Sequence, residues 1–123
     1  MRTLLIVDDE DGVRSLVRMT LDSDSLEILE AKEGHQALEV ARAHHPDLIL
    51  LDVMLPDLSG IEICRELKSD PLMASTKIVM LTAKAQQSDL GEAEEAGADG
   101  YFTKPFSPIA LTQKVEAILG PDS

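Results

Sequence analysis

The sequence lacks long apolar runs, and it contains a single cysteine. No stretch of its 123 residues approaches the roughly 20 apolar residues that a membrane-spanning helix needs, so we expect no membrane contact. The first residues, MRTLLIV, lead directly into the acidic DDED and lack the length and the small-residue cleavage site of a secretory signal. We therefore expect a cytoplasmic location. Cys64 cannot form an internal disulfide, and its apolar neighbours Ile61, Ile63 and Leu67 predict a buried thiol.

Positive charge is also scarce. The 11 lysine and arginine residues are outnumbered by 23 aspartate and glutamate residues, which gives a net charge of -12. This balance opposes direct binding to nucleic-acid phosphates or to anionic lipid. Most of the acidic residues are expected to lie on the solvated surface. Three of them, Asp8, Asp9 and Asp52, need a different account because of where they fall along the chain.

The chain length suits one globular domain, which we expect to span residues 1–123. Short aliphatic runs alternate with segments of helical periodicity. The expected strands are 4–7, 26–29, 48–51, 78–81 and 101–102, and the expected helices are 11–22, 34–44, 59–69, 89–96 and 107–119. Strands that are aliphatic at nearly every position are covered on both faces. The pattern therefore predicts an α/β fold with a parallel sheet between two layers of helices.

The residues that follow the aliphatic runs carry functional groups. In an open parallel sheet such groups gather at the edge where the strands have their carboxyl ends. They are Asp8, Asp9 and Glu10 after 4–7, Asp52 after 48–51, Thr82 after 78–81, and Lys104 with Pro105 after 101–102. The expected strand 26–29 alone ends without one, in Ala31 and Lys32.

Each of these residues also has a purely structural explanation. Asp8 or Asp9 could cap the following helix, and Thr82 could be an ordinary loop hydroxyl. Lys104 could point into solvent, and Pro105 could only turn the chain. Together, however, they would place three carboxylates, a hydroxyl and an ammonium at one edge of the sheet. This combination favours a functional site over a set of coincidences.

Clustered carboxylates repel one another and must bind a proton or a cation. Oxygen ligands, without histidine or cysteine at metal-ligand spacing, indicate a hard ion such as Mg²⁺, which commonly takes a substrate phosphate as a further ligand. Lys104 and Thr82 could then stabilise the oxygens of a phosphoryl group during transfer. Asp52, at the end of a stiff aliphatic strand, is the carboxylate best placed to accept that group.

Four segments carry a resemblance to a known family: LLIVDDE, PDLILLDVMLPDLSG, KIVMLTA and GADGYFTKPF. With these segments the chain resembles, over essentially its whole length, the receiver domain of two-component response regulators. The resemblance implies a doubly wound, flavodoxin-like (βα)5 fold with strand order 2-1-3-4-5. It also implies that Asp52 is phosphorylated from the phosphohistidine of a sensor histidine kinase or a phosphotransfer protein.

The resemblance further implies roles for individual residues. Mg²⁺ would be held by Asp9, Asp52 and the backbone carbonyl of Met54, with Asp8 acting through water. Thr82 and Tyr101 would form a switch pair whose output face is the fourth helix, the fifth strand and the fifth helix, and the bond before Pro105 would be cis. The chain would be a switch that catalyses only its own phosphorylation and dephosphorylation. The resemblance does not identify the downstream effector, and it leaves open whether phosphorylation makes the chain dimerise.

Two other classes of protein share parts of this pattern. A small Mg²⁺-dependent phosphatase of the haloacid-dehalogenase kind also uses an aspartate nucleophile on a similar sheet. Such enzymes usually carry Asp-x-Asp, whereas the residue two after Asp52 is Met54. An inert binding module that only keeps the fold would be expected to have lost an acidic or lysine position, and none is lost.

Two positions predict how long a phosphoryl group would persist. Met54 and Lys84 lie two residues after Asp52 and Thr82. Hydrolysis needs a water molecule oriented on the phosphoryl group, and neither a thioether nor a cation is a good acceptor to orient it. We therefore expect a persistent acyl phosphate. For His35, His44 and His45 we expect surface roles, because none follows an expected strand.

Overall fold

Within residues 1–83 and 90–120, which the computed structural model describes, five parallel strands form one sheet in the order β2-β1-β3-β4-β5. This order confirms the flavodoxin-like fold. The elements are β1 (Arg2–Val7), α1 (Asp11–Leu21), β2 (Leu26–Ala31), α2 (Gly34–His44), β3 (Leu48–Asp52), α3 (Gly60–Lys68), η1 (Pro71–Met73), β4 (Lys77–Ala83), α4 (Leu90–Glu95), β5 (Gly100–Lys104) and α5 (Pro108–Leu119).

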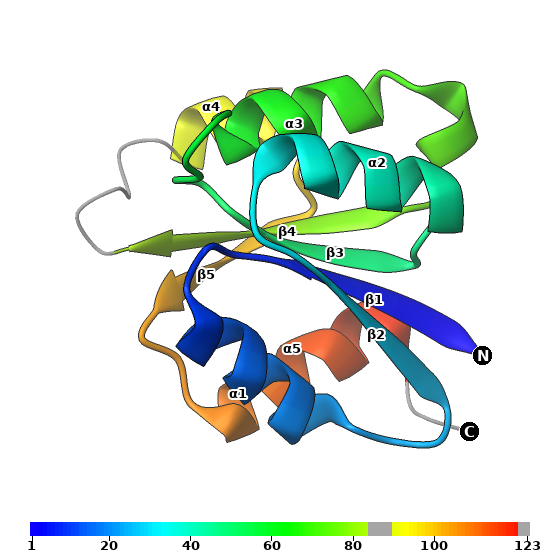
Figure 1. Cartoon of the computed structure of the whole chain (residues 1–123), viewed down its shortest axis with the longest axis vertical. Helices are drawn as coiled ribbons and strands as arrows, with labels where there is room; N and C mark the ends of the chain where they lie inside the picture. Colours follow the sequence, from blue (N-terminus) through cyan, green and yellow to red (C-terminus); the bar gives the residue numbers. More distant parts are fainter. Residues whose placement is uncertain (84–89, 121–123) are drawn as a thin grey trace.

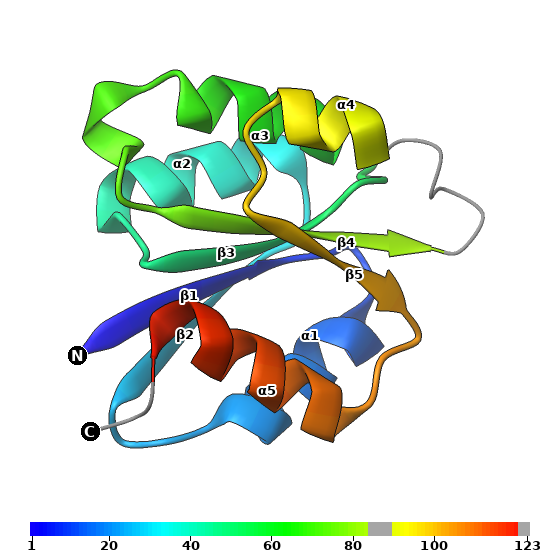
Figure 2. The same ribbon diagram turned by 180° about the vertical axis from the view of Figure 1, so that it is seen from behind.

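The helices lie in two layers. In Figures 1 and 2, α2, α3 and α4 cover one face of the sheet, and α1 and α5 cover the other. Successive residues of a strand point to opposite faces, so each of the strands β1 to β4 contributes to two separate cores. Leu5 and Val7 pack under the α2–α4 layer, whereas Leu4 and Ile6 pack under the α1 and α5 layer. Because every residue of β3 is buried, its aliphatic run is explained by this double coverage.

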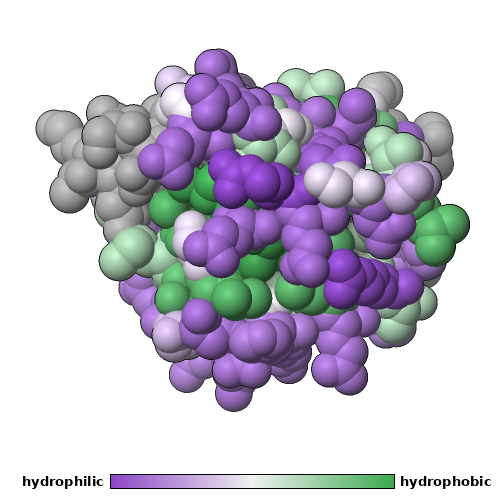
Figure 3. All heavy atoms as spheres, turned by 90° about the horizontal axis from the view of Figure 1, so that it is seen from above, coloured by the Kyte–Doolittle hydropathy of each residue, from purple (hydrophilic) through white to green (hydrophobic). Residues whose placement is uncertain are grey.

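The surface of the α2–α4 layer is largely hydrophilic. Figure 3 shows this face, with hydrophobic atoms visible in a band between hydrophilic side chains. Beneath it, Cys64 is fully buried, as predicted, and burial raises the pKa of its thiol to about 11. Among the helices of residues 1–83 and 90–120, none is long and apolar enough to cross a membrane.

The connection between β3 and α3 folds back tightly on the end of β3. Gly60 donates its N–H to the carbonyl of Val53 at 2.8 Å. A Cβ at Gly60 would lie 2.0 Å from the carbonyl oxygen of Asp52, so only glycine fits there. The Ser59 hydroxyl then caps α3 by accepting the N–H of Ile61 at 3.2 Å. This connection fixes the end of the strand that carries Asp52.

Some element boundaries differ from those predicted. β3, β4 and β5 continue through polar residues, so that Asp52, Thr82 and Lys104 are the last or next-to-last residues of strands and do not follow them. Strand pairing uses backbone groups and continues wherever a partner strand runs alongside, as Ala83 does opposite Lys104. The short η1 was not predicted. Asp70 caps its start, because the Asp70 side chain accepts the N–H of Leu72 at 3.0 Å.

Candidate functional site

Three acidic residues and one lysine meet at the carboxyl edge of the sheet. Asp8, just after β1, is fully buried, and Asp52, the last residue of β3, is 4% exposed. The ammonium of Lys104 reaches between them from the end of β5. Its Nζ lies 2.7 Å from Oδ2 of Asp8, 3.4 Å from Oδ2 of Asp52 and 3.4 Å from Oε1 of Glu10. The structure thus brings together side chains that are far apart in the sequence.

The electrostatic environment favours a proton or a cation at Asp52. Burial raises the pKa of Asp52 to about 6, and the negative charge of Asp8 adds to this effect. Lys104 and the N–H of Met54, which donates to Oδ1 of Asp52 at 3.2 Å, act in the opposite direction. Burial by itself lowers the pKa of Lys104, but the surrounding carboxylates outweigh it and raise that pKa above its usual value.

The oxygen atoms at this edge are suited to a hard divalent cation. Asp8, Asp9 and Glu10 each offer a carboxylate oxygen, and these atoms all lie within 4.8 Å of one another. Asp8 is buried, whereas Asp9 and Glu10 are exposed and open to an incoming ion. Apart from its ion pair with Lys104, Oδ2 of Asp8 has no hydrogen-bond partner among the residues that the structure describes. The sequence pattern alone gives Glu10 no specific role.

Thr82 and Tyr101 lie at different depths. Thr82 is fully buried near the end of β4, and its hydroxyl donates to the carbonyl of Ala83 at 3.1 Å. Tyr101, on the neighbouring edge strand β5, is 51% exposed. The Lys104–Pro105 peptide bond is cis, which is the isomer that the resemblance implies. Lys84 lies outside the described residues.

Two groups of interacting side chains were not found from the sequence. The side chain of Arg14 lies behind the loop that carries Asp8, where its guanidinium binds the Asp8 carbonyl. The only sequence feature that could have indicated this role is the position of Arg14, one turn into the helix that follows an acidic run. The second group is a pair of residues: Nδ1 of His35 lies 2.5 Å from Oδ2 of Asp57. Burial acts to raise the pKa of Asp57, but hydrogen bonds from His35 and Gly34 lower it well below its usual range.

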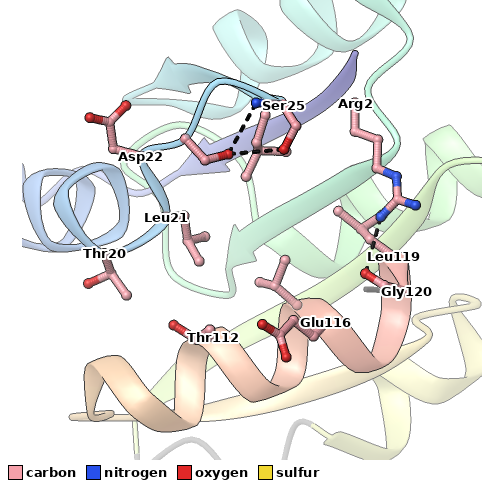
Figure 4. Close-up of a pocket in the computed structure, with 12 residues that line it drawn as sticks. Arg2, Thr20, Leu21, Asp22, Ser25, Thr112, Glu116, Leu119 and Gly120 are labelled. Atoms are coloured by element: carbon pink, nitrogen blue, oxygen red, sulfur yellow. Dashed lines mark hydrogen bonds between the residues drawn. The ribbon is translucent and has the colours of Figure 1, made fainter. Parts of the chain in front are cut away.

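A separate pocket of about 190 Å³ lies at the opposite end of the sheet. Figure 4 shows it between the end of α1, the start of β2 and the last turns of α5. Arg2 closes one side by donating from Nη1 to the carbonyl of Gly120 at 3.2 Å, and Leu21 and Leu119 supply apolar walls. None of the residues that line it belongs to the acidic edge, so the two features are independent.

The fold and the buried aspartate–lysine site together define a flavodoxin-like domain of the receiver type. Residues 4–116 match the family model described as the response regulator receiver domain, and the chain belongs to this family. Receiver domains take part in phosphorylation-dependent signalling between a histidine kinase and a downstream effector.

Individual relatives agree with this assignment. The chain is 47% identical over 118 residues to the phosphate regulon transcriptional regulatory protein PhoB of Pseudomonas aeruginosa, a match that covers 96% of this chain and 52% of that protein. It is 44% identical over 118 residues to the alkaline phosphatase synthesis transcriptional regulatory protein PhoP of Bacillus subtilis, covering 96% and 48%. The crystal structure of a putative response regulator from Chloroflexus aurantiacus superimposes with a TM-score of 0.89 at 37% identity and covers 98% of each chain. The chain spans about half the length of the curated relatives it matches.

Proposed function

We propose that the chain accepts a phosphoryl group on Asp52 from the phosphohistidine of a histidine kinase or a phosphotransfer protein, in a reaction that depends on Mg²⁺. The observation that carries this proposal is the position of Lys104, whose Nζ lies 2.7 Å from Asp8 and 3.4 Å from Asp52. A single cation between two buried carboxylates is ready to bind the oxygens of a phosphoryl group that arrives at Asp52.

Asp52 acts as the nucleophile. Its Oδ1 accepts the Met54 N–H and its Oδ2 faces Lys104, so both oxygens are held in place. In the transfer, an Asp52 oxygen forms a bond to phosphorus while the bond between phosphorus and the imidazole nitrogen of the donor breaks, and its electron pair stays on that nitrogen. The carboxylate must be ionised to attack. Because its pKa is about 6, most of it is ionised above pH 7 even without metal.

The metal would be held by oxygen ligands alone. We assign Asp9, Asp52 and the backbone carbonyl of Met54 as direct ligands and Asp8 as a ligand through water. The cluster of Asp8, Asp9 and Glu10 oxygens supports the roles of Asp8 and Asp9. When bound, Mg²⁺ would neutralise negative charge on the phosphoryl oxygens. Lys104 would exchange part of its contact with Asp8 for a phosphoryl oxygen, and the Thr82 hydroxyl would donate to another.

The response would emerge through Thr82 and Tyr101 on the face formed by α4, β5 and α5. Thr82 is buried on β4, and β4 pairs directly with β5, which carries the half-exposed Tyr101. A Thr82 hydroxyl drawn towards the phosphoryl group would leave room for the Tyr101 ring to turn inward. This face would then bind an effector or a second copy of the chain.

A phosphatase of the haloacid-dehalogenase kind is the weaker alternative. Its second carboxylate would stand at position 54, where the side chain is an exposed methionine, 61% accessible. We therefore propose a switch that catalyses only its own phosphorylation and dephosphorylation. The names of the relatives describe transcriptional regulators, whereas the net charge of -12 of this chain opposes direct binding to DNA phosphates.

Labelling with a small phosphodonor tests the acceptor. Incubation with acetyl phosphate and Mg²⁺ is expected to add one phosphoryl group, measured by intact mass spectrometry. Asp52→Asn is expected to stay unmodified, while Asp57→Asn, which alters a carboxylate whose partners are Gly34 and His35 and not Lys104, is expected to be labelled normally. Lys104→Ala is expected to be labelled more slowly while keeping its fold. Efficient labelling of Asp52→Asn at another residue would overturn the assignment.

A further inference from the structure

Arg14 is a buried arginine that binds backbone as well as carboxylates. Its side chain is 7% exposed, although it belongs to α1, a surface helix. Nη1 donates to the carbonyl oxygen of Asp8 at 2.7 Å, Nε donates to Oε1 of Glu30 at 3.1 Å, and Nη2 pairs with Asp11. A guanidinium is costly to bury unless its donors are used. Here each edge of the guanidinium has a different partner, so its orientation is fixed.

The hydrogen bond from Arg14 to the Asp8 carbonyl completes the set of contacts that hold Asp8 in place. The N–H of Asp8 donates to the carbonyl of Ala31 in β2 at 3.1 Å. Its Oδ1 accepts the N–H of Glu10 at 2.9 Å, and its Oδ2 faces Lys104. Arg14 supplies the remaining contact, at the carbonyl through which the chain continues into Asp9. The direction in which Asp9 and Glu10 leave the sheet therefore depends on Arg14.

Glu30 holds Arg14 in this position from β2. Its Oε1 accepts from Arg14, and its Oε2 accepts from Nε of Arg18 at 2.8 Å. Arg18 in turn donates to the carbonyl of Ile28 at 3.0 Å, so both arginines and the glutamate are tied to the same strand. β2 places no polar group at the site itself. Glu30 nevertheless connects β2, through Arg14, to the segment that carries Asp8, Asp9 and Glu10.

We infer that Arg14 is a positioning residue for the metal site, and that Glu30 orients it. The inference rests on the proposed Mg²⁺ site and extends it to two residues that contact neither metal nor phosphoryl group. Mg²⁺ demands near-ideal octahedral geometry, so a small change in the path of Asp8 and Asp9 weakens its binding. Lysine cannot replace Arg14, because one ammonium cannot span the Asp8 carbonyl and Glu30 with the spacing of the planar guanidinium.

The test compares Mg²⁺ binding in Arg14→Lys, Arg14→Met and Glu30→Gln. Mg²⁺ is titrated without any phosphodonor and followed by amide NMR shifts, and the folded fraction of each variant is measured by circular dichroism. Arg14→Lys and Arg14→Met are expected to weaken Mg²⁺ binding by about 10- to 100-fold, the range found when residues behind metal ligands are changed. Glu30→Gln is expected to weaken it by a smaller factor. Arg42→Lys is the matched control, because Arg42 also lies between two carboxylates, Glu66 and Asp70, but on the other face of the sheet.

A second readout separates positioning from a general loss of stability. With acetyl phosphate, the Mg²⁺ concentration for half-maximal labelling is expected to rise in the Arg14 variants, while the rate at saturating Mg²⁺ falls much less. If Arg14→Met does not fold, Arg14→Lys and Glu30→Gln decide the question. Folded variants that bind Mg²⁺ as tightly as the unaltered chain would overturn the inference. Failure of the unaltered chain to be labelled at Asp52 would instead overturn the proposed function. The Mg²⁺ titration would still test the role of Arg14 in that case.

Discussion

The central strand β3 and the edge strand β5 differ in how firmly the structure holds them. Every residue of β3 is buried, and Gly60 packs directly against its end. β5 has no buried residue, and the neighbouring α4 spans only six residues, Leu90–Glu95. An acceptor needs fixed geometry, whereas an element that responds must rearrange at low cost. The comparison suggests that chemistry belongs to the centre of the sheet and response to its edge.

The largest loss of stability is expected for Gly60→Ala, which alters the firmly held end of β3. Its Cβ would lie 2.0 Å from the Asp52 carbonyl, so the β3–α3 connection must move, and we expect a destabilisation of about 3 kcal/mol. Gly91→Ala in α4 is the control from the other region, because a Cβ there has nothing within 4 Å. It is expected to be neutral or to stabilise by less than about 1 kcal/mol. Urea unfolding of both variants measures the difference, and equal losses would contradict it.

Asp52→Asn is expected to stabilise the metal-free domain in a pH-dependent way. The pKa of Asp52 is raised from 3.8 to about 6 in the folded state, so the charged carboxylate opposes folding above pH 6. This cost is relieved as the pH falls from about 6 towards 4, because the folded state then binds the proton more tightly than the unfolded state. At pH 7.5 the variant is expected to be more stable by up to about 3 kcal/mol, from about two pKa units at 1.36 kcal/mol each.

Denaturant unfolding between pH 4 and pH 8, in the presence of a chelator, measures this effect. The stability difference between Asp52→Asn and the unaltered chain is expected to shrink as the pH falls. Saturating Mg²⁺ is expected to reduce it at pH 7.5 as well, because the cation stabilises the ionised carboxylate. A difference that is constant with pH would show that burial of the Asp52 charge is not its cause.

Thr82→Ala is expected to uncouple phosphorylation of Asp52, at the centre of the sheet, from the response of the edge strand β5. Beryllofluoride with Mg²⁺, which stands in for the phosphoryl group on Asp52, is expected to shift amide NMR signals of β5 more than those of α2. A coupling of about 1 to 3 kcal/mol would be enough for such a response. The variant is expected to lose the β5 shifts while Asp52 is still labelled by acetyl phosphate. Shifts concentrated on α2, or an unchanged pattern in the variant, would refute this route.

The smallest expected effect concerns the lifetime of the acyl phosphate. Met54→Asn and Lys84→Glu each introduce a group that can orient water, and we expect each to speed dephosphorylation several-fold, which corresponds to about 1 kcal/mol in the barrier. Mass spectrometry after removal of the phosphodonor follows the decay. Met54→Leu, which keeps an apolar side chain, is the control. Unchanged decay in both polar variants would contradict the prediction.

Much of the fold could be predicted because its signals are local or periodic. Buried parallel strands need aliphatic residues at nearly every position, and their carboxyl ends meet at one edge, so Asp8, Asp52 and Lys104 could be placed together from sequence alone. Arg14 and the His35–Asp57 pair could not be found in this way. Their roles depend on how a helix packs against a distant strand or loop, and neither periodicity nor spacing reports that contact.

Among the residues that the structure describes, the two apolar cores share no residue, and they are joined through the strands of the sheet. α4 packs with one core through Ala93, and Ala96 just after the helix joins the same core. α5 packs with the other core through Leu111 and Val115. The sheet lies between these two cores. A rearrangement felt by both helices must therefore pass through the backbone of the strands, and β5 is a strand with no buried residue. Because β5 packs loosely, it is the strand whose backbone can move at the lowest cost in lost packing.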